Sequence, residues 1–233
     1  MKTQLPPALF SSTCDDGDSL CLDSNSLGRQ AHICAFFQSA DEEYEVLLPY
    51  IRKGLELGQK AVHTIDPRRL EEHSRRLTTA GIPVTELRRS GQMDIRDWSA
   101  AHLKGGDFDA TRTLALFAEV LQDSIEQGFP LTRFLSHMEW FLETKLDPTI
   151  LLEYEAVTNR IWMEATGPVH PVVCTYDLRR FRGDIIVDVI RTHPLVIMGG
   201  ILQTNPFFVP PDEFLREIRA RRGKAHSDSK QRL

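Results

Sequence analysis

The chain has 233 residues, a formal net charge of −5 and 41% hydrophobic residues, so it can bury one large core without disulfides or a structural metal. The small acidic excess argues against a dedicated nucleic-acid-binding domain, which usually carries a basic face. No apolar run approaches the roughly 20 residues of a membrane span, and the N-terminus is a poor signal peptide, so we expect a cytoplasmic protein that binds no membrane.

Composition divides the chain into three parts. Residues 1–30 contain four Asp and many Ser with almost no periodic apolar pattern, which predicts a flexible acidic head. Residues 31–221 alternate strand and helix signals without a repeat or a linker, so we expect a single domain there. Residues 222–233 are polar and basic, and they predict a flexible tail.

The domain begins with a βαβ pattern. The apolar run 32–38 predicts a buried strand, and Ser39 with Glu42 forms a capping box at the start of a helix. Pro49 should kink or restart this helix, because proline donates no backbone hydrogen bond. Residues 60–65 then predict a second strand, parallel to the first and reached by a right-handed crossover.

Strand and helix signals continue to alternate along the rest of the domain. The pattern predicts further helices over 67–79, 110–127, 148–163, 183–191 and 211–221. It predicts further strands or extended segments over 82–87, 91–95, 131–138, 172–176 and 195–202, the last as a strand or a hairpin. Strands separated by helices indicate the α/β class, with a mostly parallel sheet covered by helices on both faces.

In such a sheet, ligands bind beyond the carboxyl ends of the strands. The first connection, residues 38–44, reads Gln-Ser-Ala-Asp-Glu-Glu-Tyr and has neither the glycines nor the lysine of a phosphate-binding loop. Its three acidic residues lie in the first helical turn, where they would compete with a phosphate for the field of the helix dipole. The sequence therefore argues against a nucleotide site, and we expect no cofactor.

Side chains two residues apart in a strand point to the same face of the sheet, and this spacing brings several reactive side chains together. His32, Cys34 and Phe36 share one face of the first strand, and Cys174 and Tyr176 share a face of another. These side chains could pack in the core, contact a small ligand or form part of a metal or thiol site. We expect packing or ligand contact rather than a bound metal, because the ligand spacing is not diagnostic.

A second group of candidates lies where strands or helices end. Glu139 and Trp140 place a carboxylate and an indole beside a strand end, either as part of a small-ligand site or as a helix start with a core Trp. His137 precedes them and would add a metal ligand. Asp177 is either a turn residue or a ligand contact, and His193 either stops a helix or contacts the ligand.

Several short segments resemble one family when they are taken in this order along the chain. They are His32-Ile-Cys-Ala-Phe-Phe37, Gly54-Leu-Glu-Leu-Gly58, Ala80-Gly-Ile82, Ser90-Gly-Gln92, Glu139-Trp140, Tyr154-Glu-x-x-x-Asn159, Cys174-Thr-Tyr-Asp177, Arg191-Thr-His-Pro194 and Asn205-Pro-Phe-Phe-Val-Pro-Pro211. Together they are similar to the MEDS domain, a sensory domain named for methanogens, methylotrophs and a dichloromethane-responsive regulator. The likeness spans about residues 32–215.

The resemblance implies a RecA-like α/β fold whose phosphate-binding loop has been lost, in agreement with the first connection. It also implies a role in prokaryotic signal transduction, with a simple hydrocarbon derivative as the ligand proposed for the family. Members are usually attached to a kinase or a DNA-binding output. Too few residues follow the last predicted helix here for such an output, so we expect a separate signalling partner.

Three functional hypotheses remain open. The leading one is a non-catalytic sensory or regulatory domain that binds a small organic ligand at the strand carboxyl ends. Its candidate ligand contacts are His32, Cys34, Phe36, His137, Glu139, Trp140, Cys174, Tyr176, Asp177 and His193. The second hypothesis is a protein-interaction regulator of a kinase or transcription factor that binds no small ligand. The third is an enzyme with a metal- or thiol-dependent site at His32, Cys34 and Cys174.

Overall fold

The computed structural model describes residues 31–231, and the head predicted over residues 1–30 lies outside them. Seven strands form one sheet at its centre. They are β1 His32–Phe37, β2 Lys60–Ile65, β3 Met93–Asp97, β4 Thr132–His137, β5 Val172–Asp177, β6 Leu195–Met198 and β7 Ile201–Thr204. Their order across the sheet is β3-β2-β4-β5-β1-β6-β7.

Every strand pairing in this sheet is parallel except that of β6 with β7, which form a hairpin at one edge. β1 lies between β5 and β6, with Cys34 level with Cys174 on one side and with Val196 on the other. The α/β class and the mostly parallel sheet are therefore confirmed. The strand order is compatible with the RecA-like fold that the resemblance implies.

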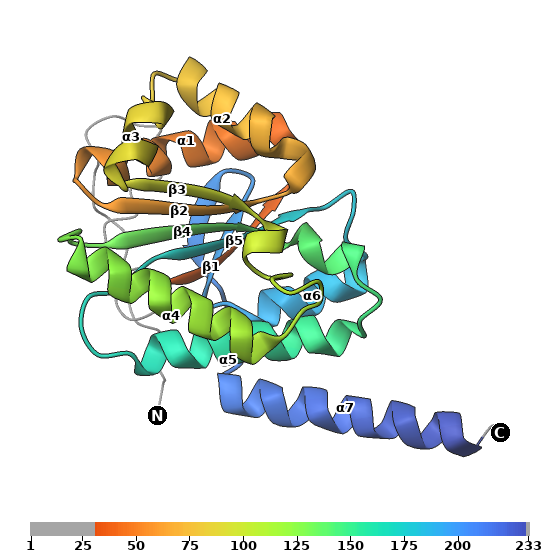
Figure 1. The fold of residues 1–233 in the computed structure, drawn as a ribbon. Coiled ribbons are helices and arrows are strands. Elements are labelled where there is room, and N and C mark those ends of the chain that lie inside the picture. The colour runs from red at the N-terminus through yellow and green to blue at the C-terminus, as the bar shows by residue number, and fades with distance from the viewer. Residues whose placement is uncertain (1–30, 232–233) are drawn as a thin grey trace, which may run out of the picture.

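Helices cover both faces of the sheet (Figure 1). On one side, here called the α1 face, lie α1 Ala40–Glu56, α2 Leu70–Thr79 and α3 Val84–Ser90. On the other, here called the α5 face, lie α4 Ala110–Glu126, α5 Pro148–Glu164, α6 Gly183–Thr192 and α7 Pro211–Gln231. Short 3-10 helices follow three of the strands: η1 Pro67–Arg69, η2 Trp98–Ala100 and η3 Met138–Glu143.

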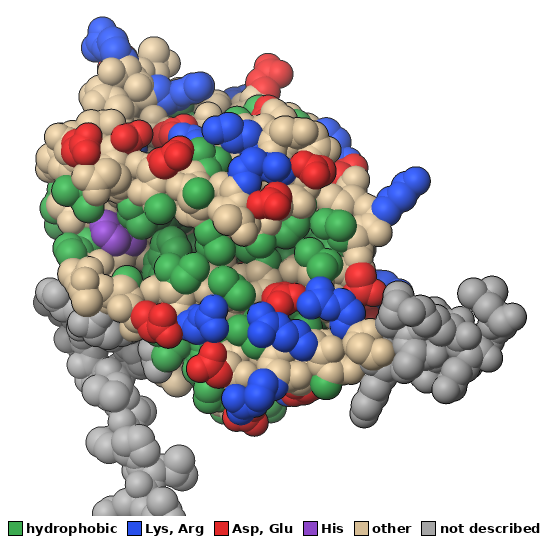
Figure 2. Space-filling view, turned by 60° about the horizontal axis from the view of Figure 1, so that its bottom comes forward, with side chains coloured by type: hydrophobic (Ala, Val, Ile, Leu, Met, Phe, Trp, Pro, Cys, Tyr) green, Lys and Arg blue, Asp and Glu red, His purple; other side chains and the backbone are tan. Residues whose placement is uncertain are grey.

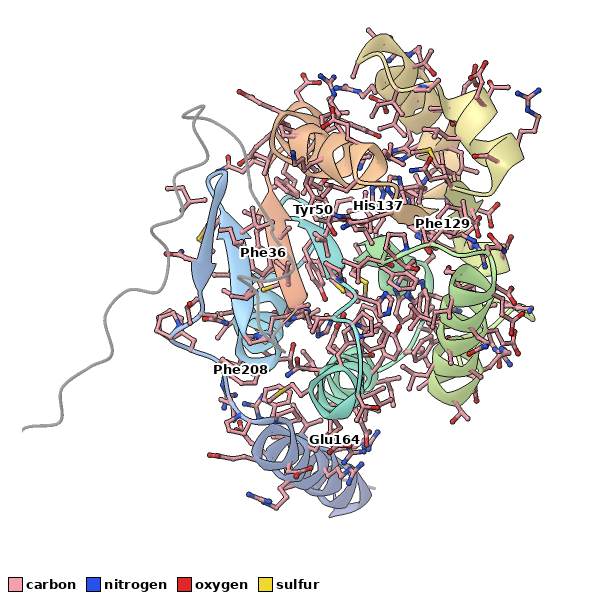
Figure 3. All side chains as sticks on the ribbon, turned by 90° about the vertical axis from the view of Figure 1, so that its left-hand side faces the viewer. Phe36, Tyr50, Phe129, His137, Glu164 and Phe208 are labelled. Atoms are coloured by element: carbon pink, nitrogen blue, oxygen red, sulfur yellow. The ribbon has the colours of Figure 1, made fainter. Side chains whose placement is uncertain are left out.

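Alternate positions of β1 supply two separate cores. Cys34 and Phe36 pack in the core of the α5 face, whereas Ile33 and Ala35 pack in the core of the α1 face. All six residues of the strand are buried, as expected for a central strand of a parallel sheet with helices on both sides. Side chains fill both layers between the sheet and the helices (Figure 3).

Helix α1 begins where the capping box predicts. The backbone N–H of Glu42 donates to Ser39 Oγ at 3.1 Å, and Glu42 Oε2 accepts from the backbone N–H of Gln38 at 2.7 Å. The helix continues through Pro49, so the predicted restart does not occur. Its first turn, which includes Glu43, therefore lies directly after the carboxyl end of β1.

The strand predicted over 82–87 is wrong, because this segment enters helix α3. Over so short a run, the spacing of apolar residues does not separate a strand from a helix. The backbone N–H of Ile82 donates to Leu77 O at 3.0 Å, which closes the end of α2, and Pro83 then precedes the first turn of α3. The edge strand β3 follows only after Gly91, whose φ of 79° ends that helix.

The last helix is longer than its sequence pattern predicts. α7 runs to Gln231, so residues 222–231 of the predicted tail belong to a helix. Within residues 31–231, no helix combines the length and the apolar character that crossing a membrane requires.

Candidate functional site

The structure separates the predicted ligand contacts into two groups. One group lies on the α5 face and consists of His32, Cys34, Phe36, Trp140, Cys174, Tyr176 and His193. The other group lies at the carboxyl ends of β4 and β5 and consists of His137, Glu139 and Asp177. The two groups do not form one site, since His137 belongs to the α1 side of the sheet, where it contacts Glu43 of α1.

Four side chains on the α5 face converge on one point. His32 comes from β1, Cys174 from the adjacent β5, Glu155 from α5, and His193 from the residue that ends α6. Glu155 Oε2 lies 3.2 Å from His32 Nε2 and 3.4 Å from His193 Nε2. Cys174 Sγ lies 3.4 Å from His32 Nε2 and 3.9 Å from Glu155 Oε2.

One nitrogen, oxygen or sulfur atom from each of these four residues lies within 4.8 Å of those of the other three. We call the four residues the His–Cys–Glu cluster. Within the described part of the chain, it is the one group of His, Cys and acidic residues close enough to share a metal ion. Cys34, which the sequence placed in the same candidate site, points its Sγ toward Leu195 O at 3.7 Å.

Neighbouring groups orient the members of the His–Cys–Glu cluster. His193 Nδ1 lies 2.9 Å from Val189 O, one turn back in α6, so this nitrogen donates to the carbonyl. Its Nε2 faces Glu155 Oε2. Although burial opposes it, Cys34, Cys174 and the Glu155 carboxylate raise the pKa of His193 well above its ordinary value. Tyr176 Oη donates to Glu155 Oε1 at 2.7 Å, which leaves Glu155 Oε2 for the two imidazoles.

Solvent does not reach the His–Cys–Glu cluster, since His32, Glu155 and His193 are each 0% exposed. Burial and the nearby His193 lower the pKa of His32 to about 4. Burial, together with the Glu155 carboxylate, raises the pKa of Cys174 to about 12. A thiol held neutral in this way is a poor nucleophile, which argues against covalent chemistry at Cys174.

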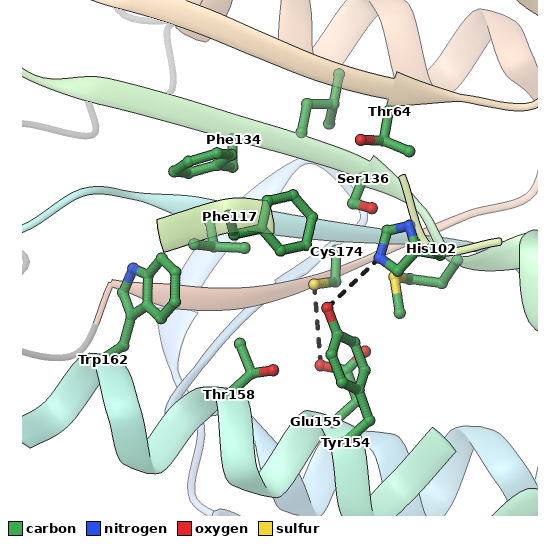
Figure 4. Close-up of a pocket in the computed structure, with 13 residues that line it drawn as sticks. Thr64, His102, Phe117, Phe134, Ser136, Tyr154, Glu155, Thr158, Trp162 and Cys174 are labelled. Carbon is green, nitrogen blue, oxygen red and sulfur yellow. Dashed lines mark hydrogen bonds between the residues drawn. The ribbon is translucent and has the colours of Figure 1, made fainter. Parts of the chain in front are cut away.

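A narrow cavity adjoins the His–Cys–Glu cluster between the sheet and helices α4 and α5. Its crevices between side chains, counted together with the open space at its mouth, come to about 390 Å³, and they are narrow. Phe117, Phe134 and Trp162 supply apolar walls, and Cys174 and Glu155 of the cluster also line it (Figure 4). On the outer surface of the same side, a band of hydrophobic side chains runs between belts of charged ones (Figure 2).

Three polar atoms that line this cavity have no hydrogen-bond partner. They are Ser136 Oγ, Thr158 Oγ1 and His102 Nδ1, all of them buried. The ring of His102 stacks on Trp140 with centroids 4.9 Å apart, so its position is fixed by packing. Buried polar groups are nearly always hydrogen-bonded. An apolar pocket with a few convergent polar groups is the usual composition of a small-molecule site.

The second group of predicted residues belongs to a set of ion pairs that we call the carboxyl-end network. Glu43 Oε1 lies 2.9 Å from His137 Nε2, and Glu43 Oε2 lies 2.9 Å from the guanidinium of Arg69. His137 Nδ1 accepts from the backbone N–H of Asp66 at 3.3 Å, so its Nε2 carries the proton that is donated to Glu43. Although burial opposes it, His137 and Arg69 hold the pKa of Glu43 below its ordinary value.

Other members of the carboxyl-end network are also paired. Asp66 binds Arg68 at 2.8 Å and Arg180 at 3.3 Å. Glu139 Oε1 accepts from the backbone N–H of Asp177 at 2.7 Å, and burial raises the pKa of this carboxyl. The small pocket at this end of the sheet is therefore walled largely by paired groups, although the buried Nε of Arg69 has no hydrogen-bond partner.

Sequence reasoning named neither Glu155 nor His102 as a site residue, although Glu155 stands in the family-like segment Tyr154-Glu-x-x-x-Asn159. A signal for Glu155 was present, because it follows Leu151 and Leu152 at helical spacing and therefore lies on the apolar stripe of α5. A carboxylate on such a stripe must be paired or bound, since an isolated buried charge is unstable. His102 lies outside the helices and strands, and no pattern in the sequence distinguishes it.

A comparison with known protein families identifies the family of this domain. Residues 31–194 match the model of a family described as MEDS, the methanogen/methylotroph, DcmR sensory domain. The matched segment contains all four members of the His–Cys–Glu cluster. No curated protein matches the chain.

Proposed function

This chain belongs to the MEDS family of sensory domains, and we propose that it senses a small, weakly polar organic molecule bound in the cavity of the α5 face. The domain acts by binding rather than by catalysis. It passes the bound state to a separate signalling protein, such as a kinase or a transcription regulator. The ligand class is that of simple hydrocarbon derivatives, such as short alcohols or halides.

The observation that carries this proposal is the set of unpartnered polar atoms in an otherwise apolar cavity. Ser136 Oγ, Thr158 Oγ1 and His102 Nδ1 each lack a hydrogen-bond partner. Leaving such a group unsatisfied costs about 1–3 kcal/mol. A molecule with one polar atom and a short apolar body would satisfy these groups and fill the space between the aromatic walls.

The proposed location differs from the one that the sequence favoured. The carboxyl-end network offers mostly paired charges, whereas the α5-face cavity offers unsatisfied donors and acceptors. Of the predicted contacts, Cys174 lines the cavity directly, and Trp140 supports it by stacking on His102. The other predicted residues on the α5 face lie around the cavity in the same core.

Helix α5 connects the cavity with the surface of the domain. It contributes Tyr154, Thr158 and Trp162 to the lining. On its outer side, α7 lies along it and extends past it (Figure 1). Glu153 of α5 pairs with Arg219 of α7 at 2.9 Å. A shift of α5 on ligand binding would therefore reach α7, which is where we propose that the partner reads the signal.

Ligand-observed NMR with a set of one- and two-carbon alcohols and halides tests the proposal. We expect one class to bind the wild-type chain and to lose binding in Thr158→Leu, because the larger side chain fills the cavity. Thr78→Leu, on the exposed side of α2, is the matched control and should bind as wild type does. Absence of binding to the folded wild type, or equal binding by Thr158→Leu, would contradict the proposal.

A second function, a protein-interaction regulator without a small ligand, is favoured by the surface of the β6–β7 hairpin. Met198 and Ile201 are 44% and 65% exposed there. Ile201→Lys would then abolish binding of a signalling partner, while Thr158→Leu would leave it unchanged. This pair of results, together with no binding of small molecules, would favour the second function over the first.

A further inference from the structure

The geometry of the His–Cys–Glu cluster points to a binding site for one divalent transition-metal ion of the zinc type. We propose that His32 Nε2, His193 Nε2, Cys174 Sγ and Glu155 Oε2 are its four ligands. This site goes beyond the proposed ligand cavity and beyond the sequence expectation, which favoured packing over a metal. It does not depend on the sensing function, because the four ligand atoms come from the protein alone.

The separations between the atoms match a tetrahedral site. Zinc binds nitrogen and oxygen ligands at about 2.0–2.2 Å and sulfur at about 2.3 Å. Two ligands of a tetrahedron are separated by about 1.6 bond lengths, which gives about 3.3–3.8 Å for these bonds. Of the six separations among the four atoms, four are 3.2 Å, 3.4 Å, 3.4 Å and 3.9 Å, and all six lie within 4.8 Å. An ion would therefore fit with only small movements of the side chains.

The surroundings orient the ligand atoms as outer groups do in known metal sites. Metal-bound imidazoles usually donate their other N–H to a carbonyl or carboxylate. His193 does this with Val189 O, and its buried Nε2 is directed at Glu155 Oε2, 3.4 Å away, whereas the buried Nδ1 of His32 has no such partner. Tyr176 Oη likewise holds Glu155 Oε1 and leaves Oε2 directed into the cluster. These contacts preorganise both ligands.

The chemical types of the ligands limit the choice of metal. Two imidazoles, one thiolate and one carboxylate suit zinc and related transition metals, whereas magnesium and calcium prefer oxygen ligands alone. On binding, the S–H proton of Cys174 leaves to solvent and the sulfur bonds to the metal as thiolate, with no redox change. The bound ion would place its positive charge beside the Glu155 carboxylate and the Cys174 thiolate. Buried negative groups of this kind are stable only when an opposite charge compensates them.

The cluster also offers a matched pair of cysteines for a test. Cys34 and Cys174 are level with each other on adjacent strands and are both buried. Only Cys174 belongs to the four-ligand set. The same Cys→Ser change can therefore be made at the proposed ligand Cys174 and, as a control in the same core, at its neighbour Cys34.

We would load the metal-free full chain with Zn²⁺ or Co²⁺ and measure bound metal by elemental analysis and the Co²⁺ form by absorption. We expect one ion per chain, tetrahedral d–d bands and a thiolate-to-cobalt charge-transfer band. Cys34→Ser should retain all three. Cys174→Ser should lose the charge-transfer band and the stoichiometric ion.

Tyr176→Phe is a second variant that keeps all four ligands and removes only the hydrogen bond to Glu155. We expect it to fold and to bind Co²⁺ about 10–100-fold more weakly, as outer-shell changes do. The proposal fails if the folded wild-type chain takes up no stoichiometric metal. It also fails if the charge-transfer band survives in Cys174→Ser or disappears in Cys34→Ser. If Cys174→Ser does not fold, the charge-transfer band of the wild type and the weakening in Tyr176→Phe decide.

Discussion

The two buried polar centres of this domain lie on opposite sides of the same sheet and are built differently. In the carboxyl-end network, carboxylates such as Glu43 and Asp66 face arginines. In the His–Cys–Glu cluster, the ion-pair partners of Glu155 are two histidines, and it lies beside a thiol. In the first centre carboxylates pair mainly with arginines, whereas in the second a carboxylate, two imidazoles and a thiol lie around one point.

This difference suggests how to distinguish a structural polar group from a functional one. A buried carboxylate that meets an arginine and a hydrogen-bonded histidine has its charge and lone pairs satisfied, so no further partner is required. The unpartnered hydroxyls of Ser136 and Thr158 are costly unless something binds them. We therefore propose a functional role for the polar groups of the α5 face and a structural role for the carboxyl-end network.

The largest expected effect comes from Glu155→Ala. Removing one partner from a buried charged group leaves the others uncompensated, so the free energy of unfolding should fall by about 3–5 kcal/mol. Urea denaturation measures it. Glu153→Ala, two residues earlier, removes surface ion pairs with α7 and should cost no more than about 1 kcal/mol. Equal costs at the two positions would refute the distinction between a buried centre and a surface pair.

Glu43→Gln tests the other side of the comparison. The amide keeps the size of the side chain but cannot pair with Arg69 and His137 as a carboxylate does. We expect a loss of about 1–3 kcal/mol of unfolding free energy and unchanged uptake of Zn²⁺ and of the small ligand. Glu45→Gln, exposed on the same helix, is the control and should be neutral. If Glu43→Gln instead removes metal or ligand binding, the carboxyl ends are functional after all.

The pH dependence of stability should come in part from two histidines on the α1 face. Burial, with the nearby His137, lowers the pKa of His63 to about 3, and burial with His63 lowers that of His73 well below its ordinary value. Arg69 also opposes protonation of His73, whereas Glu43 and Asp94 favour protonation of His63. Both rings are therefore neutral in the folded state at pH values where they are charged in the unfolded state.

Below a pH of about 6.5, the unfolded chain binds more protons at these two sites, so stability is lost as the pH falls toward their folded pKa values. Each site contributes up to about 1.4 kcal/mol per pH unit in that window. His63→Gln should reduce the slope of unfolding free energy against pH by about one proton, as measured by denaturation between pH 7 and about pH 4.5. An unchanged slope would mean that His63 is not held neutral by burial.

The smallest expected loss of stability concerns the hydroxyls of the cavity. Ser136→Ala removes an unpartnered buried group, so without ligand the free energy of unfolding should not fall, and it should rise by up to about 1–3 kcal/mol. Thr113→Val removes a buried hydroxyl that donates to Asp109 O at 2.8 Å and should cost about 1 kcal/mol. Thermal unfolding in parallel compares the two. A loss in Ser136→Ala would show that its hydroxyl already has a partner.

Sequence patterns predicted most of the fold because strands and helices alternate with clear periods. The error over 82–87 arose where a short apolar run fits either element. The alternation within each strand also predicted correctly that Cys34 shares a face with Phe36 in β1 and Cys174 with Tyr176 in β5. These features are local, and periodicity reports local features well.

The candidate site depends on tertiary contacts, which the spacing of apolar residues along the sequence does not predict. His137, at the end of its strand beside Glu139, was expected to add a ligand to His32, Cys34 and Cys174, yet it is level with Thr175 on β5 and so faces away from Cys174. Glu155 and His193 reach the cluster only because α5 and the end of α6 pack on that face. The convergence of four segments is a tertiary property, so the sequence indicated the residue types but not their meeting point.

An anomalous difference map from a crystal of the zinc-loaded chain, measured at the zinc absorption edge, tests the central claim most directly. The account predicts one peak on the α5 face, bonded to His32 Nε2, His193 Nε2, Cys174 Sγ and Glu155 Oε2. A map with no peak among these four atoms, or with its peak in the carboxyl-end network between Glu43 and His137, would contradict it.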